Sequence, residues 1–391
     1  MDLNKLETRF CEVFNGKEEQ VKLFFSPGRV NLIGEHIDYN GGFVFPAAIT
    51  FGTYAAVGLR ADGKVGVYSR NFAEDGVRLF ELSSLERCKN ESWSVYVKGV
   101  IDVFIKAGYD VKQGFNAYID TTLPKGVGGL STSASLELLI GQILDELNGF
   151  NMDMIEKVKL TQKAENEYVG VNCGIMDQFA VGMGKKDYAI KLNTNDLSYE
   201  YVVCDLQDYR VLIMNTNKKR VLADSKYNER RAECDRALVC LQQKADIVYL
   251  CDLIPLKFEL ISNVLVEEVL YKRARHAVYE NERVKLAIKA LKQGDLMAFG
   301  ELLNESHESL RDDYEVTGEE LDIIVALAQE QEGVLGARMT GAGFGGCAIA
   351  IVHKDKLQIV QTAIAKGYKE AIGYDASFYE ASIGDGTKTL Y

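Results

Sequence analysis

A segment rich in glycine and hydroxyl residues, at positions 124–135, has the composition of a phosphate-binding loop. It reads PKGVGGLSTSAS, and its glycines are Gly126, Gly128 and Gly129. Because glycine has no Cβ, backbone N–H groups here can turn toward a ligand. Apolar residues then recur at helical spacing over residues 136–147, so a helix follows and directs its N-terminal N–H groups and dipole at the same place. An ordinary glycine-rich turn with a serine N-cap is the alternative.

A second glycine loop, MTGAGFGG at residues 339–346, fits the GxGxxG pattern of dinucleotide-binding proteins. That function requires a strand before the loop and a helix after it. The apolar run CAIAIV follows directly and predicts a strand, so a dehydrogenase is not favoured. We expect this loop to approach a ligand or the first glycine loop closely. The chain contains neither a Walker A loop nor the HRD and DFG motifs of protein kinases.

Three polar residues near the N-terminus, Glu35, His36 and Asp38, lie beside Arg29 and Asn31. Two carboxylates and an imidazole offer several acceptors and one or two donors, which suits the neighbouring hydroxyl groups of a sugar. A metal site would need more than one nearby histidine, and the four histidines of the chain are scattered. A surface cluster of salt bridges is the other alternative.

Two further acids have apolar neighbours. Asp177 lies in GVNCGIMDQFA, where partial burial indicates either a functional role or a turn-capping role. Glu165 follows Val158 by seven residues, so both fall on one face of a helix expected over residues 153–169. A carboxylate on that face needs a cation, which is either Mg²⁺ or a buried arginine or lysine.

A mixed succession of strands and helices must position these residues. Antiparallel strands are expected over 43–59 and 65–68, and further strands over 114–122, 187–192, 199–204 and 210–215. Helices are expected over 94–107, 153–169 and 225–244. Helices then dominate from about residue 264 to 330. The shift toward helical composition near residue 205 predicts two domains, residues 1–205 and 206–391.

The overall composition excludes several classes of partner. With 57 acidic and 45 basic residues the net charge is −12, which disfavours nucleic acids and anionic membranes. We recognise no signal peptide and no apolar stretch long enough to span a bilayer. The eight cysteines include no CxxC pair, so free thiols in a reducing cytoplasm are expected.

Beyond these patterns, the chain resembles the galactokinases of the GHMP kinase superfamily almost from end to end. The matching blocks are SPGRVNLIGEHIDYNGG, LPKGVGGLSTSASLE, GVNCGIMDQF, DSKYNERRAEC, RARHAVYENERV, SLRDDYEVTGEELD and RMTGAGFGGC. The first and the last few are specific to galactokinases rather than to the superfamily. The sequence departs from the usual pattern by one extra residue between Pro124 and Leu130, and by Ile37, Thr132 and Asn166.

The resemblance implies a role for each matching residue. Asp177 is expected to be the catalytic base for an anomeric hydroxyl, and Arg29 to stabilise the reacting groups. The implied sugar ligands are Glu35, His36, Asp38, Gly174 and Tyr227. The implied nucleotide-binding residues are Gly126, Gly128, Gly129, Ser131, Thr132, Ser133, Ala134 and Ser135, with Trp93 near the adenine. Ser133 and Glu165 are the implied Mg²⁺ ligands.

The resemblance also implies a fold and a reaction. The fold is a two-domain GHMP kinase fold of the α/β and α+β classes. Its N-terminal domain would be like domain 2 of ribosomal protein S5, with a left-handed βαβ crossover where pattern alone favours a right-handed one. Its C-terminal domain would be ferredoxin-like. The expected reaction is phosphorylation of galactose by ATP at C1, in a cytoplasmic monomer or weak homo-oligomer.

The resemblance leaves two other functions open. A kinase for arabinose, galacturonate or N-acetylgalactosamine is the nearest, because a few side chains could change the sugar. A non-catalytic sensor of sugar and ATP is less favoured, since the serine segment 133–135, Asp177 and Arg29 are all intact.

Overall fold

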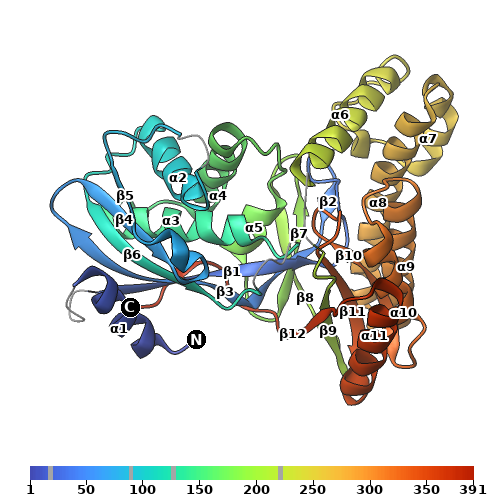
Figure 1. The fold of residues 1–391 in the computed structure, drawn as a ribbon. Helices are drawn as coiled ribbons and strands as arrows, with labels where there is room; N and C mark the ends of the chain where they lie inside the picture. The colour runs from blue at the N-terminus through green and yellow to red at the C-terminus, as the bar shows by residue number, and fades with distance from the viewer. Residues whose placement is uncertain (16–20, 88–90, 125–128, 219–222) are drawn as a thin grey trace.

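The structure is a computed structural model that describes residues 1–15, 21–87, 91–124, 129–218 and 223–391. Two domains lie side by side, and both chain ends lie on the N-terminal one (Figure 1). The N-terminal domain contains a six-stranded sheet in the order β13-β1-β3-β6-β4-β5. Its strands are β1 (Lys22–Asn31), β3 (Pro46–Arg60), β4 (Lys64–Ser69), β5 (Arg78–Glu81), β6 (Gly114–Thr121) and β13 (Lys388–Thr389).

Alternating side chains give this sheet two apolar faces. On β1, Leu23 packs toward helix α1 (Leu3–Phe14), whereas Phe24 packs into the core on the opposite face. This period of two is the one that a strand imposes. Helices on that opposite face and beside it are α2 (Ser94–Lys106), α3 (Thr132–Asn148), α4 (Met154–Lys163) and α5 (Met176–Met183). The sheet therefore separates α1 from the helices that carry the predicted site.

Most of the expected elements of this domain are confirmed, with two differences. β3 and β4 do not pair with each other, because β6 lies between them, antiparallel to β3 and parallel to β4. The helix expected over 153–169 is α-helical only to Lys163 and continues as a π-helical segment, Ala164–Val169, up to Gly170. Its apolar spacing does not signal this change, which is of a kind that recurs at functional sites.

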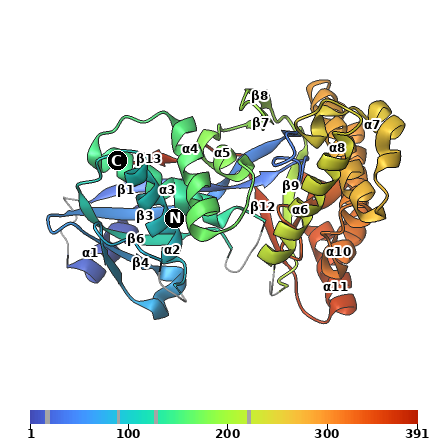
Figure 2. The same ribbon diagram turned by 90° about the horizontal axis from the view of Figure 1, so that it is seen from above.

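The C-terminal domain is built on a four-stranded antiparallel sheet in the order β10-β11-β9-β12. Its strands are β9 (Tyr209–Asn215), β10 (Val334–Thr340), β11 (Cys347–His353) and β12 (Ser377–Ala381). A helical region joins β9 to β10, and one helix joins β11 to β12, which is the ferredoxin-like succession that was expected. The helices are α6 (Ala223–Leu241), α7 (Pro255–Ile261), α8 (Glu268–Lys292), α9 (Leu296–Asp312), α10 (Glu319–Gln329) and α11 (Leu357–Ile372), which are labelled in Figure 1. Figure 2 shows the same domain from above.

Several segments connect the two halves. A small sheet of β2 (Phe43–Val44), β7 (Tyr188–Asn193) and β8 (Tyr199–Val203) lies between them. The chain end returns to the first sheet, where β13 pairs with β1. The domain boundary at residue 205 stays a prediction, since β1 from the first predicted domain and β13 from the second belong to the same six-stranded sheet.

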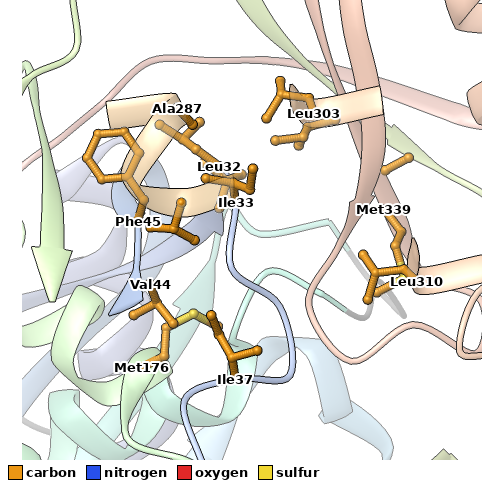
Figure 3. Close-up of a cluster of buried hydrophobic side chains, with 14 of the residues drawn as sticks. Leu32, Ile33, Ile37, Val44, Phe45, Met176, Ala287, Leu303, Leu310 and Met339 are labelled. Atoms are coloured by element: carbon orange, nitrogen blue, oxygen red, sulfur yellow. The ribbon is translucent and has the colours of Figure 1, made fainter. Parts of the chain in front are cut away.

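A buried apolar cluster fixes the loop that follows β1 (Figure 3). Leu32 and Ile33 lie near residues of α8 and α9, and Ile37 lies near Met176 of α5. All three are 0% exposed. The loop that carries Glu35, His36 and Asp38 is thus anchored in a core formed by both domains. Among the described residues, no helix combines the length and apolar character needed to cross a bilayer.

Candidate active site

Most of the predicted site residues that the structure describes line two adjoining cavities. The first, of about 280 Å³, is lined by Arg29, Glu35, His36, Asp38, Gly129, Ser131, Thr132, Ser133, Glu165, Gly174, Asp177 and Tyr227, among others. The second, of about 230 Å³, is lined by Trp93 and Phe72 and shares Thr132 and Ser133 with the first. Gly126 and Gly128 belong to residues 125–128, which are outside the described residues. The extra residue of the loop lies in the same stretch, between Pro124 and Leu130. The start of α3 therefore separates a polar cavity from an aromatic one.

An ion pair between Arg29 and Asp177 lines the polar cavity. Asp177, in the first turn of α5, accepts hydrogen bonds from Arg29 Nε at 2.9 Å and Nη2 at 2.6 Å. The arginine side chain is 3% exposed and the aspartate 30%, so the carboxylate is the accessible partner. Arg29 also donates through Nη1 to the carbonyl of Gly129. One buried guanidinium thus ties the acid of α5 to the glycine loop before α3.

The start of α3 has the features of an anion site. Ser131 takes a left-handed conformation (φ 56°), and its buried hydroxyl has no partner within the described residues. Thr132 and Ser133 follow in the first turn, where N–H groups have no carbonyl one turn earlier in the helix. Such a helix start attracts phosphate.

Ser135 differs from the expectation that it binds nucleotide. Its hydroxyl donates to the carbonyl of Ser26 at 2.8 Å and contacts the Thr53 hydroxyl at 2.9 Å. Its N–H donates to the carbonyl of Ser131 at 2.9 Å. Ser135 and Ala134 are both 0% exposed and line neither cavity. The Ser135 hydroxyl therefore joins α3 to β1 and β3.

The two glycine loops touch, as one of the alternatives for the second loop predicted. A Cβ added to Gly341, which has φ +83°, would lie 2.5 Å from Gly129 Cα. A Cβ added to Gly129 would lie 2.6 Å from the carbonyl oxygen of Thr340. Only glycine allows this contact, so the second loop supports the first from the C-terminal domain.

Gly341→Ala is expected to raise the KM for ATP roughly tenfold, because a methyl group in a left-handed conformation would push the loops apart. Gly373→Ala is the matched control: Gly373 also has positive φ (+90°), but a Cβ there meets nothing within 4 Å. Both variants carry the same backbone strain, and steady-state kinetics separates them. Equal KM values for ATP in the two variants would argue against a supporting role for the loop contact.

Glu35 and His36 are buried, and they do not form the surface salt-bridge cluster considered above. Glu35 Oε2 pairs with Arg338 Nη2 at 2.7 Å, and Oε1 accepts from the Gly341 N–H at 2.8 Å. His36 contacts the Tyr39 hydroxyl through Nδ1 at 2.8 Å and the Ala342 carbonyl through Nε2 at 3.2 Å. Burial lowers the pKa of His36 to about 3, so its ring is neutral. Both residues thus hold the wall of the polar cavity that lies against the second glycine loop.

Asp38 carries the carboxylate with the most unusual pKa of this wall. Burial, followed by the nearby charge of Asp177, raises the pKa of Asp38 to about 7. A Cβ on Gly174 would lie 1.9 Å from Asp38 Oδ2, so glycine is required beside it. Tyr227 of α6 completes this side, with its ring centroid 5.4 Å from that of His36. The arrangement offers acid, phenol and backbone groups to hydroxyls of a ligand.

Asp38→Asn is expected to change how stability depends on pH. The folded protein keeps the Asp38 proton up to about pH 7, whereas the unfolded chain releases it near about pH 4. Wild type therefore loses stability from this group as the pH rises across that interval. The unfolding free energy of the variant, relative to wild type, should rise by roughly 1–3 kcal/mol between about pH 4 and about pH 8. Urea denaturation at both pH values tests this, and an unchanged difference would contradict it.

Glu165 lies at the start of the π-helical segment, and no lysine or arginine of the described residues pairs with it. Burial raises its pKa to about 7, Asp177 adds to the rise, and hydrogen bonds from Ser133, Cys173 and Gln178 oppose it. The alternative of a buried arginine or lysine finds no support among the described residues. A hydroxyl and a buried carboxylate fit Mg²⁺, which keeps water and phosphate as its other ligands. In the described part of the chain no three His, Cys, Asp or Glu side chains gather to bind a metal on their own.

Sequence reasoning missed three residues around this site. Glu137 lies on the buried face of α3, three residues before Ile140 and seven before Leu144, so the test that found Glu165 would have found it. Gln178 directly follows Asp177, and its burial has no signature in the sequence. Arg338 lies on β10, where buried residues run continuously rather than alternate. Its pairing with Glu35 depends on the tertiary fold.

The second cavity is lined largely by aromatic and other apolar side chains. Trp93 is 8% exposed and stacks near Phe72 at a centroid distance of 6.2 Å and an interplanar angle of 15°. Tyr96, Ile119 and Leu136 add apolar surface to the cavity. Trp93 therefore lines a cavity beside the start of α3, and its place near adenine stays a prediction.

Comparison with known proteins decides the family. The galactokinase galactose-binding signature matches residues 8–59, the GHMP kinases N terminal domain matches 95–185, and the GHMP kinases C terminal profile matches 287–370. A galactokinase of Clostridium acetobutylicum is 52% identical over 388 residues, which cover 99% of this chain and 99% of that protein. The chain belongs to the galactokinase family.

Solved structures agree with this membership. The crystal structure of Lactococcus lactis galactokinase complexed with galactose matches with a TM-score of 0.97 and 53% identity, covering 99% of this chain and 100% of that one. A mevalonate kinase matches with a TM-score of 0.65 at 18% identity, covering 93% and 99% of the two chains, and so shares the fold. The predicted GHMP kinase fold is confirmed for this member of the galactokinase family.

Proposed function

We propose that the chain transfers the γ-phosphoryl group of ATP to the C1 hydroxyl of galactose, giving galactose 1-phosphate and ADP. The observation that carries the proposal is the Arg29–Asp177 pair, which stands in a polar cavity at the N-terminus of α3. Full-length relatives named galactokinase, and one solved with galactose, support the choice of sugar.

We propose a place for each substrate in one of the two cavities. Adenine would lie in the aromatic cavity beside Trp93, and the phosphates would cross Thr132 and Ser133 at the start of α3. Galactose would lie in the polar cavity, among the side chains of Asp38 and Tyr227 and the backbone of Gly174. Because Thr132 and Ser133 line both cavities, the terminal phosphate and the sugar would meet beside these two residues.

Phosphoryl transfer depends mainly on positioning and on stabilising charge. Asp177 would accept the proton of the C1 hydroxyl, whose oxygen forms the new bond to phosphorus as the bond to ADP breaks. Arg29 holds the Asp177 side chain in place through two hydrogen bonds, and the α3 N–H groups would stabilise charge on the transferred group. Mg²⁺ bound at Ser133 and Glu165 would neutralise charge on the nucleotide phosphates.

The cellular setting is proposed on the same basis. Seven cysteines of the described residues are free thiols, which suits a reducing compartment where ATP is also available. We place the reaction in the cytoplasm. Whether the enzyme acts as a monomer or a weak homo-oligomer stays a prediction.

A coupled assay of ADP release over a panel of sugars with Mg-ATP tests the proposal. Galactose should give the highest kcat/KM, with arabinose, galacturonate and N-acetylgalactosamine well below it. A higher kcat/KM for one of these three sugars would assign the enzyme to that sugar, and no sugar-dependent ADP release would favour the sensor.

A further inference from the structure

The carboxylate of Glu165 is held by a side-chain amide that also holds a second buried acid. Gln178 Nε2 donates to Glu165 Oε2 at 2.6 Å and to Glu137 Oε2 at 3.0 Å. Glu137 and Gln178 are 0% exposed, and Glu165 is 6% exposed. One amide group therefore bridges two carboxylates almost entirely out of contact with water.

This bridge is a costly way to fill the core. Oε1 of Glu137 and Oε1 of Gln178 have no hydrogen-bond partner within the described residues. A buried polar atom without a partner costs about 1–3 kcal/mol. Apolar side chains of similar volume would be expected to stabilise the fold better. Buried polar groups that lower the stability of the fold in this way are expected at functional positions.

The bridge links the three elements that carry the proposed metal and proton-transfer residues. Glu137 lies one turn after Ser133 on α3, and Gln178 directly follows Asp177 on α5. Glu165 belongs to the π-helical segment between them in the chain. Cys173 Sγ adds a longer contact to the same oxygen, Glu165 Oε2, at 3.4 Å. The contacts of Gln178 therefore set the distance of Glu165 from both α3 and α5.

We propose that Gln178 is the positioning residue for the metal-binding carboxylate: its amide holds Glu165 against Glu137 and presents it to the Mg²⁺ of the bound nucleotide. The inference rests on the proposed role of Glu165 in metal binding. Residues that orient a metal ligand in this way typically contribute 10–100-fold to metal affinity, which is roughly the size of effect expected here.

Binding of ADP to the full-length protein, measured by calorimetry with excess Mg²⁺ and with EDTA, tests the proposal without relying on turnover. Gln178→Leu should reduce the gain in ADP affinity that Mg²⁺ gives by about tenfold or more. Affinity for ADP in EDTA and affinity for galactose should stay within about twofold of wild type, which a general structural defect would not produce. Gln178→Met, which fills similar volume with an unbranched chain, repeats the test if the leucine variant does not fold.

Two further variants make the result specific. Glu165→Gln should lose the effect of Mg²⁺, as Gln178→Leu does. Gln162→Leu is the matched control, because Gln162 donates to the Cys173 carbonyl at 3.2 Å and not to Glu165; it should respond to Mg²⁺ as wild type does. An equal Mg²⁺ effect in wild type and Gln178→Leu overturns this inference and leaves the galactokinase reaction standing. No Mg²⁺ effect in wild type overturns the metal assignment and this inference together, while the sugar assay still judges the reaction.

Discussion

Asp177→Asn should lower kcat about 10²–10⁴-fold, because the variant can no longer accept the proton of the sugar hydroxyl. Asparagine keeps the shape of the side chain, so the galactose dissociation constant should change little. The dissociation constant is measured by calorimetry and kcat by ADP release. Asp196→Asn is the control for the same chemical change, since Asp196 is exposed and bonds only to the nearby Ser198 in the described structure.

The outcome also distinguishes two roles of Asp177. The aspartate is the ion-pair partner of buried Arg29, so the variant could lose activity through a displaced arginine. Galactose affinity and the thermal midpoint report such a displacement. A variant with near-normal kcat would remove Asp177 from proton transfer, whatever its stability.

Arg338→Met should lower the unfolding free energy by about 3–5 kcal/mol, because it leaves a buried carboxylate without its cation. Arg338 is 0% exposed and its partner Glu35 is 1% exposed. The guanidinium also donates to the Ser306 hydroxyl at 3.2 Å and to the Asn31 carbonyl at 3.2 Å. Loss of the guanidinium therefore affects the loop that carries Glu35, strand β10 and helix α9 at once.

Arg311→Met provides the comparison on the surface. Arg311 pairs with Asp312 at 2.8 Å, and the two side chains are 44% and 62% exposed. An exposed pair of this kind contributes less than about 1 kcal/mol. Urea denaturation of both variants measures the difference. If Arg338→Met cost no more than Arg311→Met, the Glu35–Arg338 pair would not be what holds the two domains together at the site.

Local patterns predicted the parts of this protein that depend on local physics. The apolar spacing over residues 136–147 predicts a helix after the first glycine loop, where α3 lies, and Gly149 ends α3 with φ +66° as a C-terminal glycine does. The strand after the second glycine loop excluded the dinucleotide site, and the structure places that loop against Gly129.

Features that depend on long-range contacts were not predictable from these patterns. The Gly341 N–H reaches Glu35 across 306 positions of sequence, and no local spacing indicates that contact. The π-helical segment has the same apolar spacing as an α-helix, so the sequence does not indicate that Glu165 lies in a π-helical turn. Roles for individual site residues came from family resemblance. Geometry then separated Ser131, whose hydroxyl has no hydrogen-bond partner in the described part of the chain, from Ser135, whose hydroxyl is hydrogen-bonded.

The position of the new phosphate on the sugar tests the account most directly. After reaction of galactose with Mg-ATP, phosphorus–proton correlation NMR identifies the carbon that carries the phosphate. Our assignment predicts coupling of phosphorus to H1 of galactose, with one ADP formed for each sugar phosphate and the signal greatly reduced in Asp177→Asn. Coupling to H6, or ADP release without any sugar phosphate, would contradict it.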